Sequence, residues 1–162
     1  MKNKTAYITG GTKGIGFGIA KILLDNGYNV AISGRREEDT QKAVSQLHQN
    51  GERVLGLVSD VSNLQNEVLA VNEILNKWGR LDVVVANAGV GHFGPIDTLE
   101  PTKWHEMINT NLNGVYHTLK ATVEALKQSK GYYISIASLA GTNFFENGAG
   151  YNATKFGVVG FT

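Results

Sequence analysis

Tyr151 and Lys155 are the two residues whose types and spacing point most directly to chemistry. Side chains four residues apart in a helix lie on one face, so this pair would set an ammonium group beside a phenol. A phenol with a pKa of about 10 is a poor proton shuttle at neutral pH, and a neighbouring positive charge lowers that pKa. The same spacing recurs at Tyr116 and Lys120, in the middle of a predicted helix. Only the first pair has a serine partner, because Ser138 precedes it at the end of a predicted buried strand.

A second cluster is the glycine-rich stretch at residues 9–16, Thr-Gly-Gly-Thr-Lys-Gly-Ile-Gly. It lies between a short apolar run at residues 6–8 and a segment with apolar residues at helical spacing. Because a helix N-terminus has unpaired N–H groups and partial positive charge, a glycine turn there receives a phosphate at close range. Gly10, Gly14 and Gly16 would supply the backbone angles and the close approach that such a turn needs. The alternative is a flexible loop, since the spacing differs from the commoner Gly-x-Gly-x-x-Gly.

The elements that must position these residues alternate between strand and helix. Strands are predicted at residues 6–8, 29–33, 53–58, 81–86 and 132–136, and helices from the glycine turn to residue 25, at 37–49, 64–78 and 103–128, and from residue 151 onward. This alternation predicts an α/β fold, a parallel sheet covered by helices on both faces. Asn111 is a misfit inside the long fourth helix, because asparagine is not favoured there.

The composition limits the number of domains and the kinds of partner that the chain can have. Its 162 residues, 42% hydrophobic and 18% charged, predict one globular domain over residues 1–162. A net charge of +1 argues against a nucleic-acid partner, and four scattered histidines with no cysteine argue against a metal site. The sequence has neither a signal-peptide core nor an apolar run of membrane-spanning length. We therefore expect a cytoplasmic protein with neither membrane nor nucleic-acid partners.

Together these motifs resemble the short-chain dehydrogenase/reductase family, and the resemblance covers the entire chain. It rests on the glycine turn, on Asn87-Ala88-Gly89 after the fourth predicted strand, and on Asn111, Ser138, Tyr151 and Lys155 in this order. The family usually has a further Asn where this chain has Ala86. The resemblance implies a Rossmann-type doubly wound parallel sheet in three layers. It also implies an oxidoreductase that passes hydride between a nicotinamide dinucleotide and a small-molecule carbonyl or secondary alcohol.

The resemblance assigns a role to each of the four catalytic positions. Tyr151 would exchange a proton with the substrate oxygen, and Ser138 would hydrogen-bond that oxygen. Lys155, with the positive ring of the oxidised cofactor, would lower the pKa of the tyrosine and would hold the nicotinamide ribose. Asn111 would hold a water that passes protons to Lys155.

The end of the second predicted strand favours NADP(H) over NAD(H). An acidic residue there would bind the ribose 2′-OH, whereas arginine suits a 2′-phosphate. This chain has Gly34 at the acid position, followed by Arg35 and Arg36, and Lys13 adds a further positive charge. The alternative is that both arginines are solvated residues at a helix start.

Further along the chain, Asp60 and Val61 would contact the adenine ring by resemblance, although Asp60 also fits an ordinary strand-to-helix turn. Asn87 would brace the central strands and keep Ala88 and Gly89 beside the cofactor. The predicted cofactor-binding residues are Gly10, Thr12, Lys13, Gly14, Ile15, Gly16, Arg35, Arg36, Asp60, Val61, Asn87, Ala88, Gly89, Tyr151 and Lys155.

The substrate pocket is predicted around residues 139–150 and the loop at His92 and Phe93. His92 is interpreted as an ordinary imidazole on a surface loop. Phe144 and Phe145 indicate either an apolar pocket or loop packing, and both interpretations stay open.

The chain ends only three turns into the helix that Tyr151 begins, whereas family members continue through two more strands. We therefore expect a domain that is incomplete at its C-terminus, with its last strands missing and an apolar strand edge exposed. A homodimer or homotetramer is implied where the C-terminal part is present. Two functions stay open: an NADP-dependent oxidoreductase, or a nucleotide-binding or regulatory module without turnover, including an inactive fragment of such a reductase.

Overall fold

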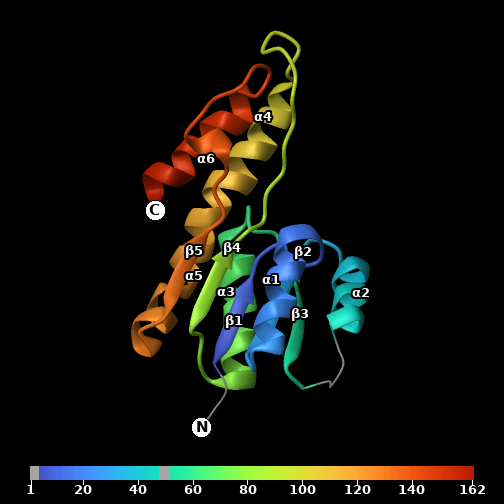
Figure 1. The fold of residues 1–162 in the computed structure, drawn as a ribbon, viewed down its shortest axis with the longest axis vertical. Coiled ribbons are helices and arrows are strands. Elements are labelled where there is room, and N and C mark those ends of the chain that lie inside the picture. Colours follow the sequence, from blue (N-terminus) through green and yellow to red (C-terminus); the bar gives the residue numbers. More distant parts are fainter. Residues whose placement is uncertain (1–3, 48–51) are drawn as a thin grey trace.

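The computed structural model describes residues 4–47 and 52–162, which form a parallel sheet with helices on both faces (Figure 1). The strands are β1 (Thr5–Ile8), β2 (Asn29–Gly34), β3 (Val54–Val58), β4 (Val83–Ala86) and β5 (Tyr132–Ser135), in the spatial order β3-β2-β1-β4-β5. Every pairing between them is parallel. The strand order reverses between β1 and β4, which is the point where ligands bind in open α/β sheets.

The helices form two layers around this sheet, so the predicted three-layer Rossmann-type fold is confirmed. They are α1 (Gly14–Asp25), α2 (Glu37–Leu47), α3 (Leu64–Trp78), α4 (Pro101–Met107), α5 (Gly114–Ser129) and α6 (Ala149–Phe161). Because side chains alternate along a strand, Ala6 and Ile8 of β1 pack on the layer of α1 and α2 with Ala20. Tyr7 between them faces the other way, toward Ile74 of α3 and the helix α5.

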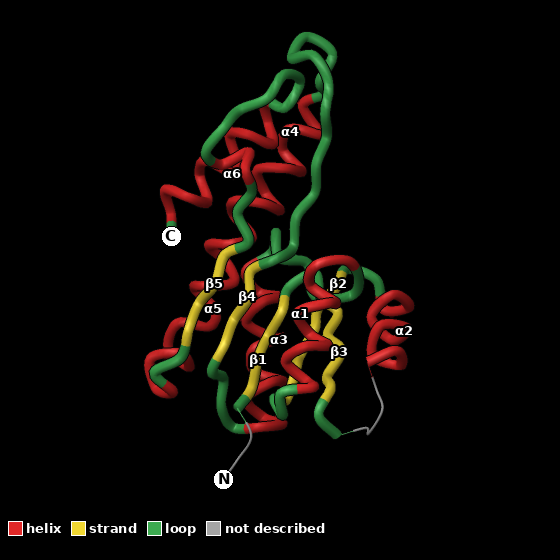
Figure 2. Tube along the Cα trace, in the orientation of Figure 1, coloured by secondary structure: helices red, strands yellow, loops and turns green. Residues whose placement is uncertain are grey.

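The upper part of the molecule is built from α4, α6 and the loop after β4. Figure 2 shows these segments extending past the carboxyl ends of β1 and β4. A short 3₁₀ helix, η2 (Leu139–Gly141), precedes α6. An added Cβ at Gly141 would lie 2.6 Å from the backbone oxygen of Lys155, so η2 approaches α6 closely. This upper part therefore brings the β5–α6 connection next to the predicted Tyr–Lys helix.

The prediction of one unbroken helix over residues 103–128 is wrong. The helix begins at Pro101 and is interrupted by a π-helical turn, η1 (Ile108–Asn113), before α5 continues to Ser129. Asn111 is buried within this turn, which accounts for the misfit seen in the sequence. Wide turns of this kind occur often at functional sites.

Other boundaries differ by one or two residues. The strand predicted at 81–86 begins at Val83, and the strand predicted at 132–136 ends at Ser135. The predicted end of the second helix at residues 48–51 lies outside the described residues. Within them, β5 pairs only with β4, and its Tyr132 and Ile134 are exposed, as the expected apolar edge requires. No helix in the described part of the chain is long and apolar enough to span a membrane.

Candidate active site

A cleft of about 560 Å³ opens at the carboxyl ends of the strands, beside the point where the strand order reverses. All predicted cofactor-binding residues line it except Gly16, Tyr151 and Lys155. Val90 and Thr110 also line the cleft and were not predicted, although each adjoins a predicted residue in the sequence. Asp39 lines it too, and nothing in the sequence singled it out.

The glycine turn has the backbone that the motif predicts. Gly10 and Gly14 have φ values of +63° and +57°, which favour glycine. A Cβ on Gly16 would lie 2.5 Å from Asn87 Nδ2 and 2.7 Å from the Gly10 oxygen. The first turn of α1 contains no acidic residue, and the N-cap residue Lys13 makes no side-chain capping bond. The positive end of this helix therefore faces the cleft without a carboxylate in its own first turn.

Asn87 fastens the loop after β4 to this turn, as the sequence predicts. Its Nδ2 donates to the backbone oxygens of Thr9 (2.9 Å) and Gly10 (3.2 Å). The Thr9 hydroxyl oxygen in turn accepts from the backbone N–H groups of Asn87 (3.0 Å) and Ala88 (3.1 Å). These bonds fix two walls of the cleft against each other.

At the end of β2, the position where an acidic side chain would bind a ribose 2′-OH is a glycine packed against threonine side chains. A Cβ on Gly34 would lie 2.6 Å from Thr12 Cγ2 and 3.2 Å from Thr40 Oγ1. Arg35 lines the cleft and approaches Glu106 of α4, with 3.5 Å between Nη1 and Oε1. This ion pair was not predicted.

Arg36 also lines the cleft, but it is held by a residue of its own helix. Its Nε and Nη2 both lie 2.6 Å from Asp39 Oδ2. Lys13, the third basic residue on this rim, forms no ion pair among the described residues. The basic rim therefore combines one unpaired and two paired cations.

Asp60 and Val61 both line the cleft after β3. The carboxylate of Asp60 accepts from the backbone N–H of Ser62 at 2.9 Å, which is the ordinary turn role left open by the sequence. Val61 is buried against α5, because a Cβ on Gly114 would lie 2.6 Å from Val61 Cγ2. One of the two Asp60 oxygens thus organises the turn.

Tyr151 and Lys155 lie on one face of α6, with 5.7 Å between Lys155 Nζ and the centroid of the tyrosine ring. Lys155 Nζ donates to the backbone oxygen of Ile136 at 2.7 Å, which ties α6 to the end of β5. Burial lowers the pKa of the Lys155 ammonium from its ordinary value. Ser138 follows two residues after Ile136, and its Oγ accepts from Ala140 N at 3.2 Å as the cap of η2.

Asn111 joins this helix to the cleft. Its Oδ1 accepts from Val90 N at 2.8 Å, and its Nδ2 donates to Val90 O at 2.8 Å and to Thr154 Oγ1 at 3.1 Å. Both Nδ2 hydrogens are thereby used within the protein. The Asn111 side chain therefore links the cleft loop to α6 by hydrogen bonds. Its predicted role in holding a water stays a prediction.

Phe93 packs against the ring of Tyr151 and also against Phe145. The Phe93 ring lies edge-on to the Tyr151 ring at 5.5 Å and tilted against the Phe145 ring at 5.8 Å. Asn152 Nδ2 donates to the backbone oxygen of Phe145 at 3.0 Å and holds that loop in place. Phe144 is 84% exposed and takes no part. The two phenylalanines of residues 144–145, which the sequence treats alike, therefore differ.

No group of three or more potential metal-ligating side chains occurs among residues 4–47 and 52–162.

Comparisons with known proteins agree with this geometry. A family model described as short chain dehydrogenase matches residues 4–162. The chain is 35% identical over 164 residues to the 3-oxoacyl-(acyl-carrier-protein) reductase FabG of Chlamydia muridarum, covering 100% of this chain and 66% of the relative. It is 33% identical over 161 residues to FabG of Staphylococcus aureus strain Mu50, covering 98% and 65%. The chain thus spans about two thirds of the length of these curated relatives.

Solved structures give the same result. An alcohol dehydrogenase from the archaeon Thermococcus sibiricus, complexed with 5-hydroxy-NADP, superposes with a TM-score of 0.93 at 36% identity, covering 98% of this chain and 68% of that chain. A 3-ketoacyl-(acyl-carrier-protein) reductase from Brucella melitensis, complexed with NADH, also gives 0.93, at 29% identity and with 99% and 68% coverage.

Proposed function

Because this chain belongs to the short-chain dehydrogenase family, we propose that it provides the cofactor cleft and catalytic residues of an NADP(H)-dependent oxidoreductase. The substrate is a carbonyl compound or a secondary alcohol. The observation that carries the proposal is the set of hydrogen bonds from Asn111 to Val90 and Thr154. These bonds join the loop that lines the cleft to the helix of Tyr151 and Lys155. Nucleotide binding and proton transfer would thereby be held in one rigid unit.

In the proposed reaction, the bound nicotinamide supplies or accepts the hydride. Tyr151 gives its phenolic proton to the carbonyl oxygen during reduction, and takes it back during oxidation. Lys155 stabilises the phenolate through its charge, from a position fixed by the Ile136 oxygen. Ser138 donates a hydrogen bond to the substrate oxygen, and Asn111 with an ordered water would return protons to Lys155.

The preference for NADP(H) is supported by the space around Gly34 and by the charge beside it. This chain has no acidic side chain here for a ribose 2′-OH, and a Cβ at this position would have to displace the Thr12 side chain, which it would meet at 2.6 Å. Arg35 and Lys13 place positive charge on the same rim. Related structures carry 5-hydroxy-NADP, NADPH or NADH, so the family alone leaves the choice open.

Residues 1–162 act in this proposal as one nucleotide-binding domain. The cytoplasmic location and the homo-oligomeric assembly expected from the sequence stay predictions.

The proposal is tested by Tyr151→Phe, with Tyr116→Phe as the matched control. Tyr116 has the same Tyr-x-x-x-Lys spacing but is exposed on α5, whereas Tyr151 and Lys155 lie on α6. With a panel of ketones and aldehydes, Tyr151→Phe should lower turnover about 10²- to 10⁴-fold and still bind NADPH. Tyr116→Phe should change neither.

Equal turnover in Tyr151→Phe and in the unmodified protein would contradict the catalytic role. The alternative, a nucleotide-binding module without turnover, predicts NADPH binding with no activity on any carbonyl in either protein.

A further inference from the structure

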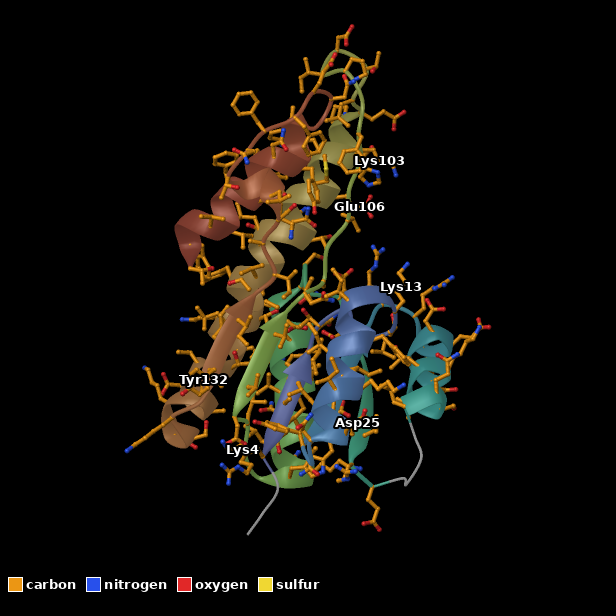
Figure 3. All side chains as sticks on the ribbon, in the orientation of Figure 1. Lys4, Lys13, Asp25, Lys103, Glu106 and Tyr132 are labelled. Carbon is orange, nitrogen blue, oxygen red and sulfur yellow. The ribbon has the colours of Figure 1, made fainter. Side chains whose placement is uncertain are left out.

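Three basic side chains from separate segments converge on the carboxylate of Glu106. His92 Nε2 lies 2.7 Å from Oε2, Arg35 Nη1 lies 3.5 Å from Oε1, and Lys103 Nζ lies 3.8 Å from Oε2. In the view of Figure 3, Glu106 on α4 lies between Lys103 and the region of Lys13 at the start of α1. The hydrogen bond from His92 holds the pKa of the Glu106 carboxyl below its usual range. Glu106 therefore carries a negative charge at neutral pH.

Glu106 stands at the rim of the cleft. It precedes Thr110, which lines the cleft, by about one helical turn. Arg35 lines the same cleft at the end of β2. The Arg35–Glu106 pair thus reaches from the end of β2 to α4, whereas Arg36 pairs with Asp39 of its own helix.

We propose that Glu106 sets the affinity of the cleft for a 2′-phosphate by competing for the guanidinium of Arg35. The inference rests on the proposed NADP(H) function and names a residue that tunes it. A 2′-phosphate bound to Arg35 would bring further negative charge close to Glu106. A nucleotide with a 2′-phosphate must therefore displace the Arg35–Glu106 pair, and its phosphate is also repelled by the Glu106 carboxylate. A nucleotide without this phosphate meets neither cost. Glu106 therefore lowers the affinity for the phosphorylated ribose selectively.

The size of the effect follows from exposure. The side chains of Arg35 and Glu106 are 57% and 31% exposed, so the pair is of the weak, solvent-screened kind. Losing such a pair changes a binding constant by about two- to fivefold. Added salt should reduce the effect, because exposed charges are screened at about 10 Å in 0.1 M salt and at about 3 Å in 1 M.

The test compares two ligands that differ only in the 2′-phosphate, adenosine 2′,5′-bisphosphate and adenosine 5′-monophosphate. Glu106→Gln keeps the shape and removes the charge. Glu124→Gln is the matched control, because it makes the same charge change on the exposed surface of α5, where Glu124 pairs with Lys127. Calorimetric titration should show about two- to fivefold tighter binding of the bisphosphate to Glu106→Gln, with no change for the monophosphate. Glu124→Gln should bind both ligands as the unmodified protein does.

A second variant separates competition from general repulsion. In an Arg35→Ala background, Glu106→Gln should give less than about half of its original gain in free energy, because no guanidinium is left to compete for. Equal gains in the two backgrounds would overturn the competition.

Each failure has its own signature. If the unmodified protein does not prefer the bisphosphate, the NADP(H) proposal fails and the inference falls with it. If that preference is present but Glu106→Gln binds the bisphosphate no more tightly, only the inference on Glu106 is overturned.

Discussion

Asn111 and Val90 are joined by two hydrogen bonds, one to the backbone N–H and one to the backbone oxygen of Val90, each 2.8 Å long. The two bonds resemble the paired N–H and C=O bonds between neighbouring β-strands, with the side-chain amide of Asn111 in place of one backbone. Asn111 lies in the π turn at residues 108–113, and this turn is the part of the helix that is bonded to the cleft loop.

Asn111→Ala should lower the free energy of unfolding by about 2–4 kcal/mol, because it removes three hydrogen bonds of a buried side chain, two to the backbone of Val90 and one to the buried Thr154. Asn113→Ala, in the same turn, should cost less than about 1 kcal/mol, since the Asn113 side chain makes one exposed hydrogen bond, to Asn109, among the described residues. Urea unfolding measures both values. Similar losses in the two variants would contradict the role of Asn111 in linking the cleft loop to α6.

The Glu67 carboxyl gives a pH dependence. Glu67 is fully buried and accepts from Tyr7 (3.0 Å), Ser59 (2.6 Å) and Thr118 (3.0 Å). Burial raises its pKa above 4.5, against the opposing effect of these donors. Because the folded state holds this proton more tightly than the unfolded state, its contribution is present below pH 4.5 and is lost as pH rises through the raised pKa.

Relative to Glu67→Gln, the unmodified protein should therefore lose unfolding free energy between pH 4.5 and neutrality. Urea unfolding of both proteins across this range measures the difference. A difference that stays constant, or that grows in favour of the unmodified protein as pH rises, would be the contrary result.

Arg35→Ala and Arg36→Ala should differ in their effect on NADPH. Removing Arg35 would take away the proposed charge-assisted bond to the 2′-phosphate and should weaken NADPH binding about tenfold or more, with little change for NADH. Arg36→Ala should have a smaller effect, because its guanidinium is engaged by Asp39. Fluorescence titration of both nucleotides checks this order, and a larger loss from Arg36→Ala would reverse the assignment.

Phe93→Ala should raise the KM for apolar carbonyl substrates about three- to tenfold, because Phe93 forms the aromatic wall beside Tyr151. Phe144→Ala is the control, since this side chain is exposed and belongs to no aromatic pair in the described part of the chain. Steady-state kinetics would contradict this account if Phe144→Ala had the larger effect.

The sequence predicted those parts of the molecule that local pattern determines. All five strands and the bounds of α3 were recovered because alternation and helical spacing are local properties. The glycine turn and the bracing by Asn87 were also predictable, since a short motif requires both.

What the sequence did not predict depends on contacts between distant segments. The hydrogen bonds of Asn111 in the π turn reach Val90 and Thr154, which lie 21 and 43 residues away in the sequence. Likewise, the Arg35–Glu106 pair joins segments 71 positions apart, and no sequence pattern near either residue predicts that they meet. The contact of Phe93 with Tyr151 also joins two distant segments, so it could not be predicted from the sequence around either residue.

The most direct test of the central claim is a fluorescence titration of the purified protein with NADPH and, separately, with NADH. The account predicts micromolar binding of NADPH and binding of NADH weaker by about tenfold or more, the difference that one charge-assisted bond to a 2′-phosphate supplies. Binding of NADH as tight as that of NADPH, or the absence of binding by either nucleotide, would contradict it.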